Sequence, residues 1–204
     1  MNPKRNARAE IVTSAWKLFY EQGYAQTTVE DIIRASGTSK GTFYHYFSGK
    51  DALLGTLSQL FDDQYTRLAA TLPPEQDSFD TLMALNRELF TMVENSISLD
   101  LLTRLYSTQL VTEGPKHLLD QNRVYFRLLR QIVLRGQERG ELNRSLPAAE
   151  IVKAYALCER ALLYDWCLLG GEYSLSAYSA RMMPRFLQFI REKQKENRIV
   201  APIS

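Results

Sequence analysis

One stretch near the amino terminus constrains this chain more than any other. Residues 27–50 read TTVEDIIRASGTSKGTFYHYFSGK. Two short helical patterns flank a Gly37-Thr38 turn, and the second pattern is small, basic and aromatic. That order is typical of a helix-turn-helix, whose second helix enters the major groove of DNA. The stretch therefore predicts a small unit of packed helices that presents one helix to a partner.

Helical spacing of apolar residues recurs through the rest of the chain, and no run alternates as a strand would. Gly23, Pro73-Pro74 and Gly140 mark helix ends, and Pro184 predicts a kink or split. Besides two short helices that begin after Thr28 and at Ser39, we expect helices over 4–22, 49–70, 78–94, 98–111, 115–139, 147–169 and 174–196. The prediction is an all-α protein of about nine helices.

The charge distribution suggests two parts. The chain has 204 residues and a net charge of +2. Residues 1–50 carry seven Lys/Arg and four Asp/Glu, a net of +3, which leaves −1 for the rest. By itself this bias is also compatible with an ordinary surface. Together with the motif, it predicts a DNA-binding domain over 1–50 and a helical body over 51–204.

The order of residues within the motif is more specific than a general helix-turn-helix. The positions that carry it are Thr28, Ile32, Gly37, Ser39-Lys40-Gly41, Phe43-Tyr44, Phe47 and Lys50. Over residues 9–55 the chain resembles the TetR/AcrR family of transcriptional regulators in these positions. It departs from the family at Ser36 and Thr38, where Ala and Val are usual, and at Tyr46, where an imidazole is often found and His45 stands one residue earlier.

Two groups of side chains are expected within the motif. Ile32, Ile33, Ala35, Phe43 and Phe47 should pack the helices together. The resemblance implies DNA contacts for Thr27, Thr28, Thr38, Ser39, Lys40, Gly41, Thr42, Tyr44, His45 and Lys50. Gly41 costs about 1 kcal/mol relative to Ala inside a helix, and Lys50 at a helix start opposes the helix dipole. Each is locally unfavourable unless DNA lies beside it.

The body is rich in Tyr, Phe and Met at helical spacing. Such residues are more often core than pocket, although buried Tyr hydroxyls need partners and could anchor a ligand. The resemblance implies an inducer site in the body, linked to the head by the helix over 49–70. The candidates for binding a small apolar or aromatic ligand are Phe61, Tyr65, Phe90, Tyr106, Tyr125, Phe126 and Trp166. A constitutive regulator with a filled core is the alternative.

The last two long helices suggest a dimerisation unit. Paired with the same helices of a second copy, they would close a four-helix bundle. The expected interface residues are Leu157, Ala161, Tyr164, Tyr178, Met182 and Phe186. The simpler alternative is that both helices cover the body's own core.

Other function classes find little support in the residues. No nucleophile and base form a recognisable pair, and Gly37–Gly41 lacks the spacing of a P-loop. Glu113 and His117 could share a metal only across Gly114-Pro115, so we expect no metal and no cofactor. Cys158 and Cys167 cannot bridge within one straight helix and are expected to be reduced.

The amino terminus has no apolar segment of a signal peptide, and no stretch is long enough to span a membrane, so a cytoplasmic location is expected. The resulting prediction is a ligand-responsive homodimeric repressor that binds a pseudo-palindromic double-stranded DNA operator. The alternative is a small-molecule-binding helical protein or enzyme with a vestigial DNA-binding head.

Overall fold

The computed structural model describes residues 6–111 and 116–192. Among these residues it is all-α, as predicted, with one antiparallel bridge between Leu142 and Arg191. The described elements are α1 (Ala7–Gln22), α2 (Val29–Ser36), α3 (Lys40–Tyr46), α4 (Lys50–Leu54), α5 (Leu57–Thr71), α6 (Ser78–Ser96), α7 (Leu99–Val111), η1 (His117–Leu119), α8 (Val124–Arg139), α9 (Ala148–Leu168), α10 (Leu175–Phe186) and η2 (Gln188–Ile190).

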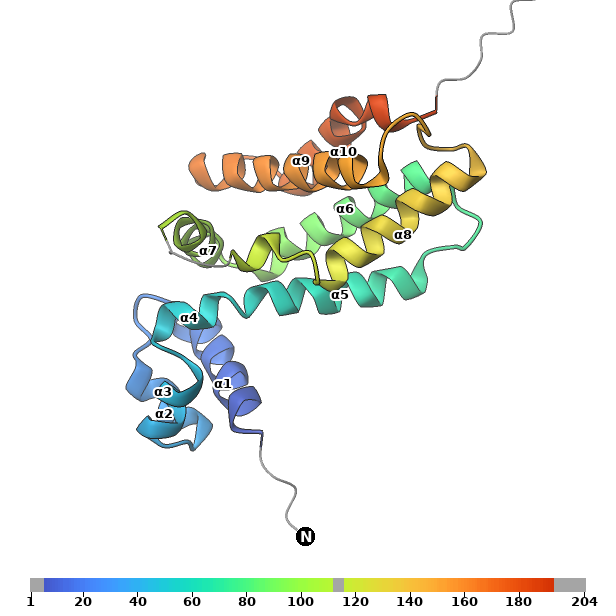
Figure 1. The fold of residues 1–204 in the computed structure, drawn as a ribbon. Coiled ribbons are helices and arrows are strands. Elements are labelled where there is room, and N and C mark those ends of the chain that lie inside the picture. The colour runs from blue at the N-terminus through green and yellow to red at the C-terminus, as the bar shows by residue number, and fades with distance from the viewer. Residues whose placement is uncertain (1–5, 112–115, 193–204) are drawn as a thin grey trace, which may run out of the picture.

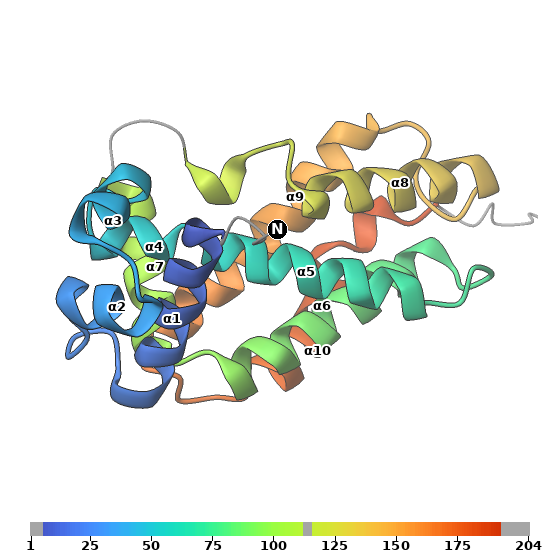
Figure 2. The same ribbon diagram turned by 90° about the horizontal axis from the view of Figure 1, so that it is seen from below.

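The helices form a small head and a larger body (Figure 1). In the head, α1 packs on both α2 and α3 through buried apolar side chains. In the body, α8 packs against α5, α6 and α9, and α10 lies against α6 and α9. Seen from below, α4 and α7 meet where the head joins the body (Figure 2). A shift of α7 can therefore act on the head, as can a shift of α5.

The helix predicted over 49–70 is interrupted. α4 ends at Leu54 and α5 begins at Leu57, so ten α-helices rather than nine are described. The Thr56 hydroxyl donates a hydrogen bond to Leu53 O (2.6 Å) and accepts one from Trp16 Nε1 (2.8 Å). A threonine that bonds its own preceding turn competes with the helical pattern. The tie to Trp16 of α1 also fixes the interruption beside the head.

Two further predicted boundaries lie elsewhere. α8 begins at Val124 rather than near 115, because the chain turns before it and the Asp120 side chain accepts a hydrogen bond from Asn122 N (2.9 Å). α10 runs through Pro184 and ends at Phe186, so the predicted break falls two residues later. A proline has no N–H for the carbonyl four residues earlier, which weakens the last helical turn.

Candidate nucleic-acid interface and ligand cavity

The turn between α2 and α3 is fixed by two helix caps and one glycine. Thr28 Oγ1 accepts a hydrogen bond from Asp31 N (3.1 Å), and Asp31 Oδ2 accepts one from Thr28 N (3.0 Å), which forms a capping box. Gly37 ends α2 in the left-handed region, at φ 62°. Ser39 Oγ then accepts a bond from Thr42 N (3.0 Å) and starts α3. These local contacts set the angle at which α3 leaves α2.

The outer side of α3 is polar and accessible. Ser39, Lys40, Tyr44 and His45 are exposed, and Tyr44 keeps 46% of its surface accessible. The Lys40 ammonium has no hydrogen bond or ion pair with another described residue. Thr42 is half-buried, and its hydroxyl lies 2.8 Å from that of Ser39. An unpaired cation beside a phenol and an imidazole suits contacts to phosphates and base edges.

The protein's own packing does not require a glycine at position 41. A Cβ built on Gly41 would meet only Ser39 Oγ, at an ordinary 3.8 Å. Gly136 of α8 is different, because a Cβ there would lie 2.7 Å from side-chain atoms of Leu142 and Ser78. Gly136 is thus explained by packing inside the body. Gly41 sits on the accessible side of α3, where the absence of a side chain allows a partner to approach closely.

Thr27 and Lys50 are turned into the protein. Thr27 is buried, and its hydroxyl donates a hydrogen bond to Gly23 O (2.8 Å). Lys50 Nζ donates to Tyr24 O (2.7 Å) and Thr27 O (2.8 Å). The two bonds close the loop between α1 and α2 onto α4. Sequence reasoning missed this role because the partners lie 26 and 23 residues away. The DNA contacts of Thr27 and Lys50 remain predictions.

Most of the expected scaffold of the motif is buried. Ile32 and Phe43 are fully buried and Phe47 nearly so, whereas Ile33 is partly buried. The expectation for Ala35 is wrong, since this residue is exposed. Ser36 takes the inner position, because it lies one helical turn after Ile32 on the same face. Its hydroxyl lies 2.8 Å from that of Thr38, so the two departures from the family pattern contact each other.

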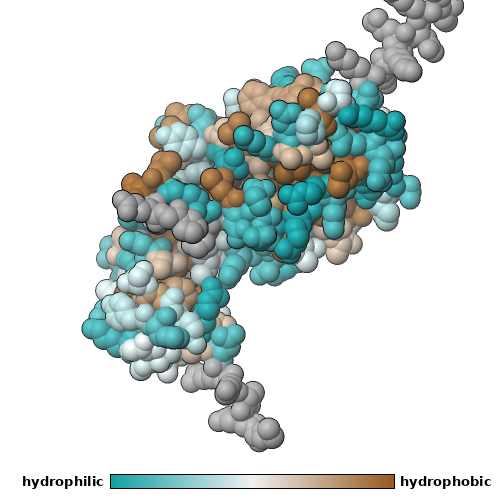
Figure 3. Space-filling model, in the orientation of Figure 1, coloured by the Kyte–Doolittle hydropathy of each residue, from teal (hydrophilic) through white to brown (hydrophobic). Residues whose placement is uncertain are grey.

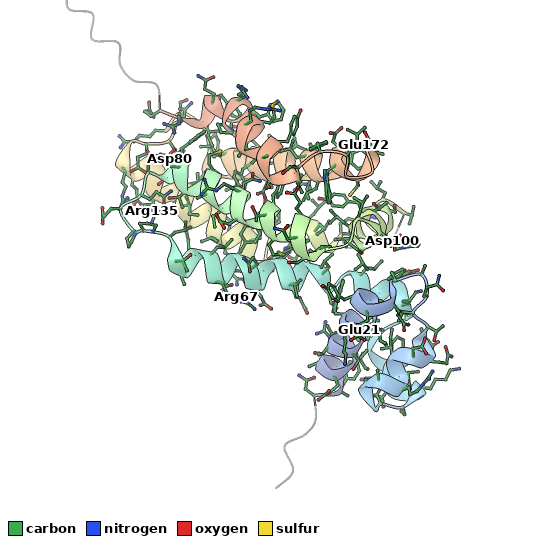
Figure 4. The ribbon with its side chains drawn as sticks, turned by 180° about the vertical axis from the view of Figure 1, so that it is seen from behind. Glu21, Arg67, Asp80, Asp100, Arg135 and Glu172 are labelled. Atoms are coloured by element: carbon green, nitrogen blue, oxygen red, sulfur yellow. The ribbon has the colours of Figure 1, made fainter. Side chains whose placement is uncertain are left out.

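Tyr24 joins the head to the body. Its ring lies 4.3 Å from Lys50 Nζ and 5.0 Å from the guanidinium carbon of Arg104 on α7, and its hydroxyl donates to the Asp51 carboxylate. Asp100, labelled in Figure 4, lies in the first turn of α7 and accepts a hydrogen bond from Arg104 Nε (3.0 Å). Burial raises the pKa of Tyr24, and the Asp51 bond raises it further. Burial, then the charge of Arg104, lowers the pKa of Lys50.

A cavity of about 50 Å³ lies inside the body. Four of the seven predicted ligand residues line it, namely Phe61, Tyr65, Tyr106 and Tyr125. The other three are packed in the core away from it, namely Phe90, Phe126 and Trp166. This volume holds about three to five water molecules and is well below the ~150 Å³ that takes up a benzene ring. A neighbouring groove of about 290 Å³ shares three lining residues with it, Tyr106, Leu118 and Arg160.

Sequence reasoning missed the most unusual residue of the cavity wall, Glu159. It is 3% exposed and accepts hydrogen bonds from Tyr125 Oη (2.7 Å), Asn86 Nδ2 (2.9 Å) and Tyr65 Oη (3.2 Å). Burial raises the pKa of the Glu159 carboxyl, although these hydrogen bonds oppose the rise. Glu159 lies four residues before Leu163, on a buried stripe of α9. That spacing is the one sequence signal that could have predicted its burial.

The residues predicted for dimerisation lie on α9 and α10. On α9 they form an exposed stripe that also lines the 290 Å³ groove, namely Leu157, Ala161 and Tyr164. On α10, Phe186 is 47% exposed, whereas Tyr178 and Met182 are half-buried. Figure 3 shows hydrophobic side chains gathered on the body, where Figure 1 draws α7, α9 and α10. The head below is mostly hydrophilic in this view.

The remaining candidate groups give no reactive centre among the described residues. Cys158 and Cys167 lie on α9 as free thiols, and burial raises the pKa of both. Glu113 falls outside the described residues, and with it the possible pair with His117. Within residues 6–111 and 116–192 no three His, Cys, Asp or Glu side chains gather as metal ligands. None of the helices in these ranges combines the length and apolar character that a membrane crossing needs.

Comparisons with known proteins agree with the geometry of the head. The family described as bacterial regulatory proteins, tetR family, matches residues 11–57. The transcriptional regulator TtgR of Pseudomonas putida is 28% identical over 184 residues, which cover 84% of this chain and 85% of that protein. The fatty acid metabolism regulator protein of Bacillus subtilis is 22% identical over 95% of this chain and its own full length.

The fold of the whole chain matches as well. The structure of Thermus thermophilus FadR, a TetR-family repressor in complex with lauroyl-CoA, superposes with a TM-score of 0.73 at 21% identity. That match covers 97% of this chain and all of the FadR chain. With α2 and α3 in place and the motif matched through α4, the chain belongs to the TetR family of helix-turn-helix transcriptional regulators and is a DNA-binding regulator rather than an enzyme.

Proposed function

We propose that this regulator is a ligand-responsive repressor that binds a pseudo-palindromic operator as a homodimer. The observation that carries the DNA-binding part is the accessible side of α3. There Lys40 has no ion pair with another described residue, and the protein's own packing does not require a glycine at position 41. In a symmetric dimer two copies of α3 would enter successive major grooves, about 34–36 Å apart. The proposed division between the DNA-binding domain and the body follows residue 50, where α4 begins.

The side chains of α3 fall into two groups, those that can contact base edges and those that can contact the DNA backbone. Lys40 can donate to a guanine edge or a phosphate, and Thr42 can contact a thymine methyl. Tyr44 and His45 are placed to meet the DNA backbone, which positions the helix without reading sequence. Thr38, Ser39 and Thr28 flank them at the two helix starts, where backbone amides favour phosphate. Because the Thr28 amide and hydroxyl are engaged by Asp31, we expect its contact to be weaker than that of Ser39.

The experiment is an operator selection with the full chain, followed by titration at a fixed salt concentration. Lys40→Ala should weaken binding to the selected operator by about tenfold, as expected for loss of one good base contact. Arg67→Ala removes an exposed cation from α5 of the body and should leave the affinity unchanged. Absence of any sequence-selective binding would favour the alternative of a body with a vestigial head.

The proposed dimer uses the exposed apolar residues of α9 and α10. Phe186→Glu would place a charge on a half-exposed apolar site and should halve the mass measured by sedimentation. Tyr20→Glu is the matched control, since Tyr20 is 82% exposed on α1 of the head. If the mass of Phe186→Glu were unchanged, the dimer interface would not include Phe186.

The proposed ligand acts on the head through the body. A ligand can shift the two copies of α3 only if it binds one conformation of the dimer more tightly than the other. The contact between Arg104 and Tyr24 offers a direct route from α7 to the loop that precedes α2. Transcriptional regulation takes place where the chromosome lies, so we place the protein in the cytoplasm. No cofactor is needed for this mechanism.

A further inference from the structure

The cavity in the body contains a buried carboxyl group that has no cation paired with it among the described residues. Glu159 is 3% exposed, and no cation among the described residues forms an ion pair with it. Burying an ionised carboxylate without a paired cation is costly, even when hydrogen bonds remain. A fold that keeps such a group in a cavity wall gains if another molecule supplies the missing charge.

The hydrogen bonds around Glu159 leave the site short of donors. Asn86 Nδ2 occupies Oε1, and the Tyr65 and Tyr125 hydroxyls occupy Oε2, so three of about four acceptor sites are filled. Tyr155 donates its proton to Leu82 O (2.8 Å) instead. Asn86 Oδ1 is also buried and accepts no hydrogen bond from any residue that the structure describes. The cluster can therefore take a further donor.

Neither nearby arginine neutralises the carboxylate. Arg123 lines the cavity but is held by Asp62 (2.8 Å) and by Ser58 O (3.1 Å). Arg160 follows Glu159 directly, and adjacent helical residues project about 100° apart. Arg160 lines both the cavity and the groove, and it forms no ion pair with Glu159.

The surroundings of the carboxylate suit an organic cation. Aromatic rings of Phe61, Tyr65, Tyr106 and Tyr125 line the cavity, and ring faces attract ammonium groups. The cavity of about 50 Å³ has space for an ammonium and a short chain. The groove of about 290 Å³ beyond Tyr106 is lined mainly by leucines and tyrosines and fits an apolar body. Tyr106 lines both spaces, and rotamer changes of such side chains are common when a ligand binds.

We propose that Glu159 binds the protonated amine of an amphipathic ligand whose apolar part lies in the neighbouring groove. This inference rests on the proposed ligand response and names the chemical class of the ligand. Burial keeps the Tyr65 and Tyr125 phenols protonated by raising each pKa well above its ordinary value, and the charge of Glu159 adds to this. Both phenols therefore remain donors while the amine binds.

The test compares three probes that share a phenethyl group and differ in charge: phenethylamine, phenethyl alcohol and hydrocinnamate. Binding to the full chain is measured by calorimetry near neutral pH. The amine should bind about tenfold more tightly than the alcohol, and Glu159→Gln should abolish that difference while leaving the alcohol unchanged. Tyr125→Phe, which frees an acceptor site on Oε2, should preserve the preference and covers the case in which Glu159→Gln does not fold.

Several outcomes would overturn the inference. Equal binding of amine and alcohol, or no binding of the amine at millimolar concentration, would exclude Glu159 as a cation anchor. Tighter binding of hydrocinnamate would make Arg160 the anchor and the ligand an acid. Phe186→Glu changes the proposed dimer interface without changing the groove. If its monomer binds the amine and the parent dimer does not, a second copy fills the groove in place of the ligand.

Operator titration keeps this inference distinct from the proposed function. If the amine binds through Glu159 but operator affinity stays constant, the site stands and the ligand response fails. If the amine does not bind while other compounds release the operator, the ligand response stands and Glu159 is not its anchor.

Discussion

Arg104 of α7 lies over the ring of Tyr24, with 5.0 Å between the guanidinium carbon and the ring centroid. Lys50 Nζ lies over the same ring at 4.3 Å. One aromatic side chain of the head thus contacts a cation of the body and a cation of α4. Lys50 also donates a hydrogen bond to Thr27 O, directly before Thr28, the residue that caps α2. A shift of α7 can therefore be transmitted through Tyr24 and Lys50 to α2 and α3.

Loss of the Arg104 contact should loosen the link between body and head. Arg104→Ala should lower the free energy of unfolding by about 0.5–1 kcal/mol, the typical worth of a partly exposed cation–π contact. It should also reduce the change in operator affinity that a ligand produces. Arg67→Ala on α5 removes an exposed arginine remote from this contact and should change neither quantity (Figure 4). Equal effects of the two variants would contradict the proposed route.

Lys50 and Lys40 should differ in their dependence on salt. The logarithm of the binding constant falls linearly with the logarithm of the salt concentration, and each phosphate contact that is lost makes this slope less steep by about 0.9. Lys50→Met should weaken operator binding with little change in slope, because its ammonium is engaged by Tyr24 O and Thr27 O. Lys40→Met should lower the slope if that lysine reaches a phosphate. A full unit of slope lost in Lys50→Met would instead show that Lys50 contacts DNA.

Gly41→Ala should separate stability from DNA binding. Its Cβ would meet only Ser39 Oγ at 3.8 Å, so the exchange should stabilise the helix by about 0.5–1 kcal/mol. The same methyl group would stand on the accessible face of α3 and should weaken operator binding. Gly136→Ala should destabilise the protein, because its Cβ would lie 2.7 Å from Leu142 and Ser78. Thermal unfolding and operator titration measure the two effects separately.

The stability of the body should depend on pH through Glu159. Its carboxyl has a raised pKa in the folded state relative to its ordinary 4.5, so above that value the folded protein holds this proton more tightly than the unfolded chain. The contribution of Glu159 to the free energy of unfolding therefore falls as pH rises through this window. The groups that face it are Tyr65 of α5, Asn86 of α6, Tyr125 of α8 and Tyr155 of α9.

Glu159→Gln should remove this pH dependence. The variant should gain stability relative to the parent as pH rises above the ordinary pKa of 4.5, measured by denaturant unfolding at each pH. A difference that shrinks over this range would contradict the raised pKa. Glu10→Gln, on the head, serves as a control for loss of one carboxylate away from the cavity.

The local features of this protein were determined by its sequence. Gly37, Ser39 and the Thr28–Asp31 capping box act over three or four residues, so their spacing alone predicted the turn that presents α3. The apolar period likewise predicted most helices. It missed the interruption at Thr56, because the hydroxyl that competes with the helix is also tied to Trp16, 40 residues away.

Only the tertiary structure decided what the long-range partners are. Lys50 looks like an exposed cation in the sequence, but folding brings its ammonium to two carbonyls of the loop before α2. Glu159 looks like one more charged helical residue, yet three other helices enclose it with tyrosines and an amide. Burial and the sharing of hydrogen bonds depend on which distant segments pack together, and short-range sequence patterns do not contain that information.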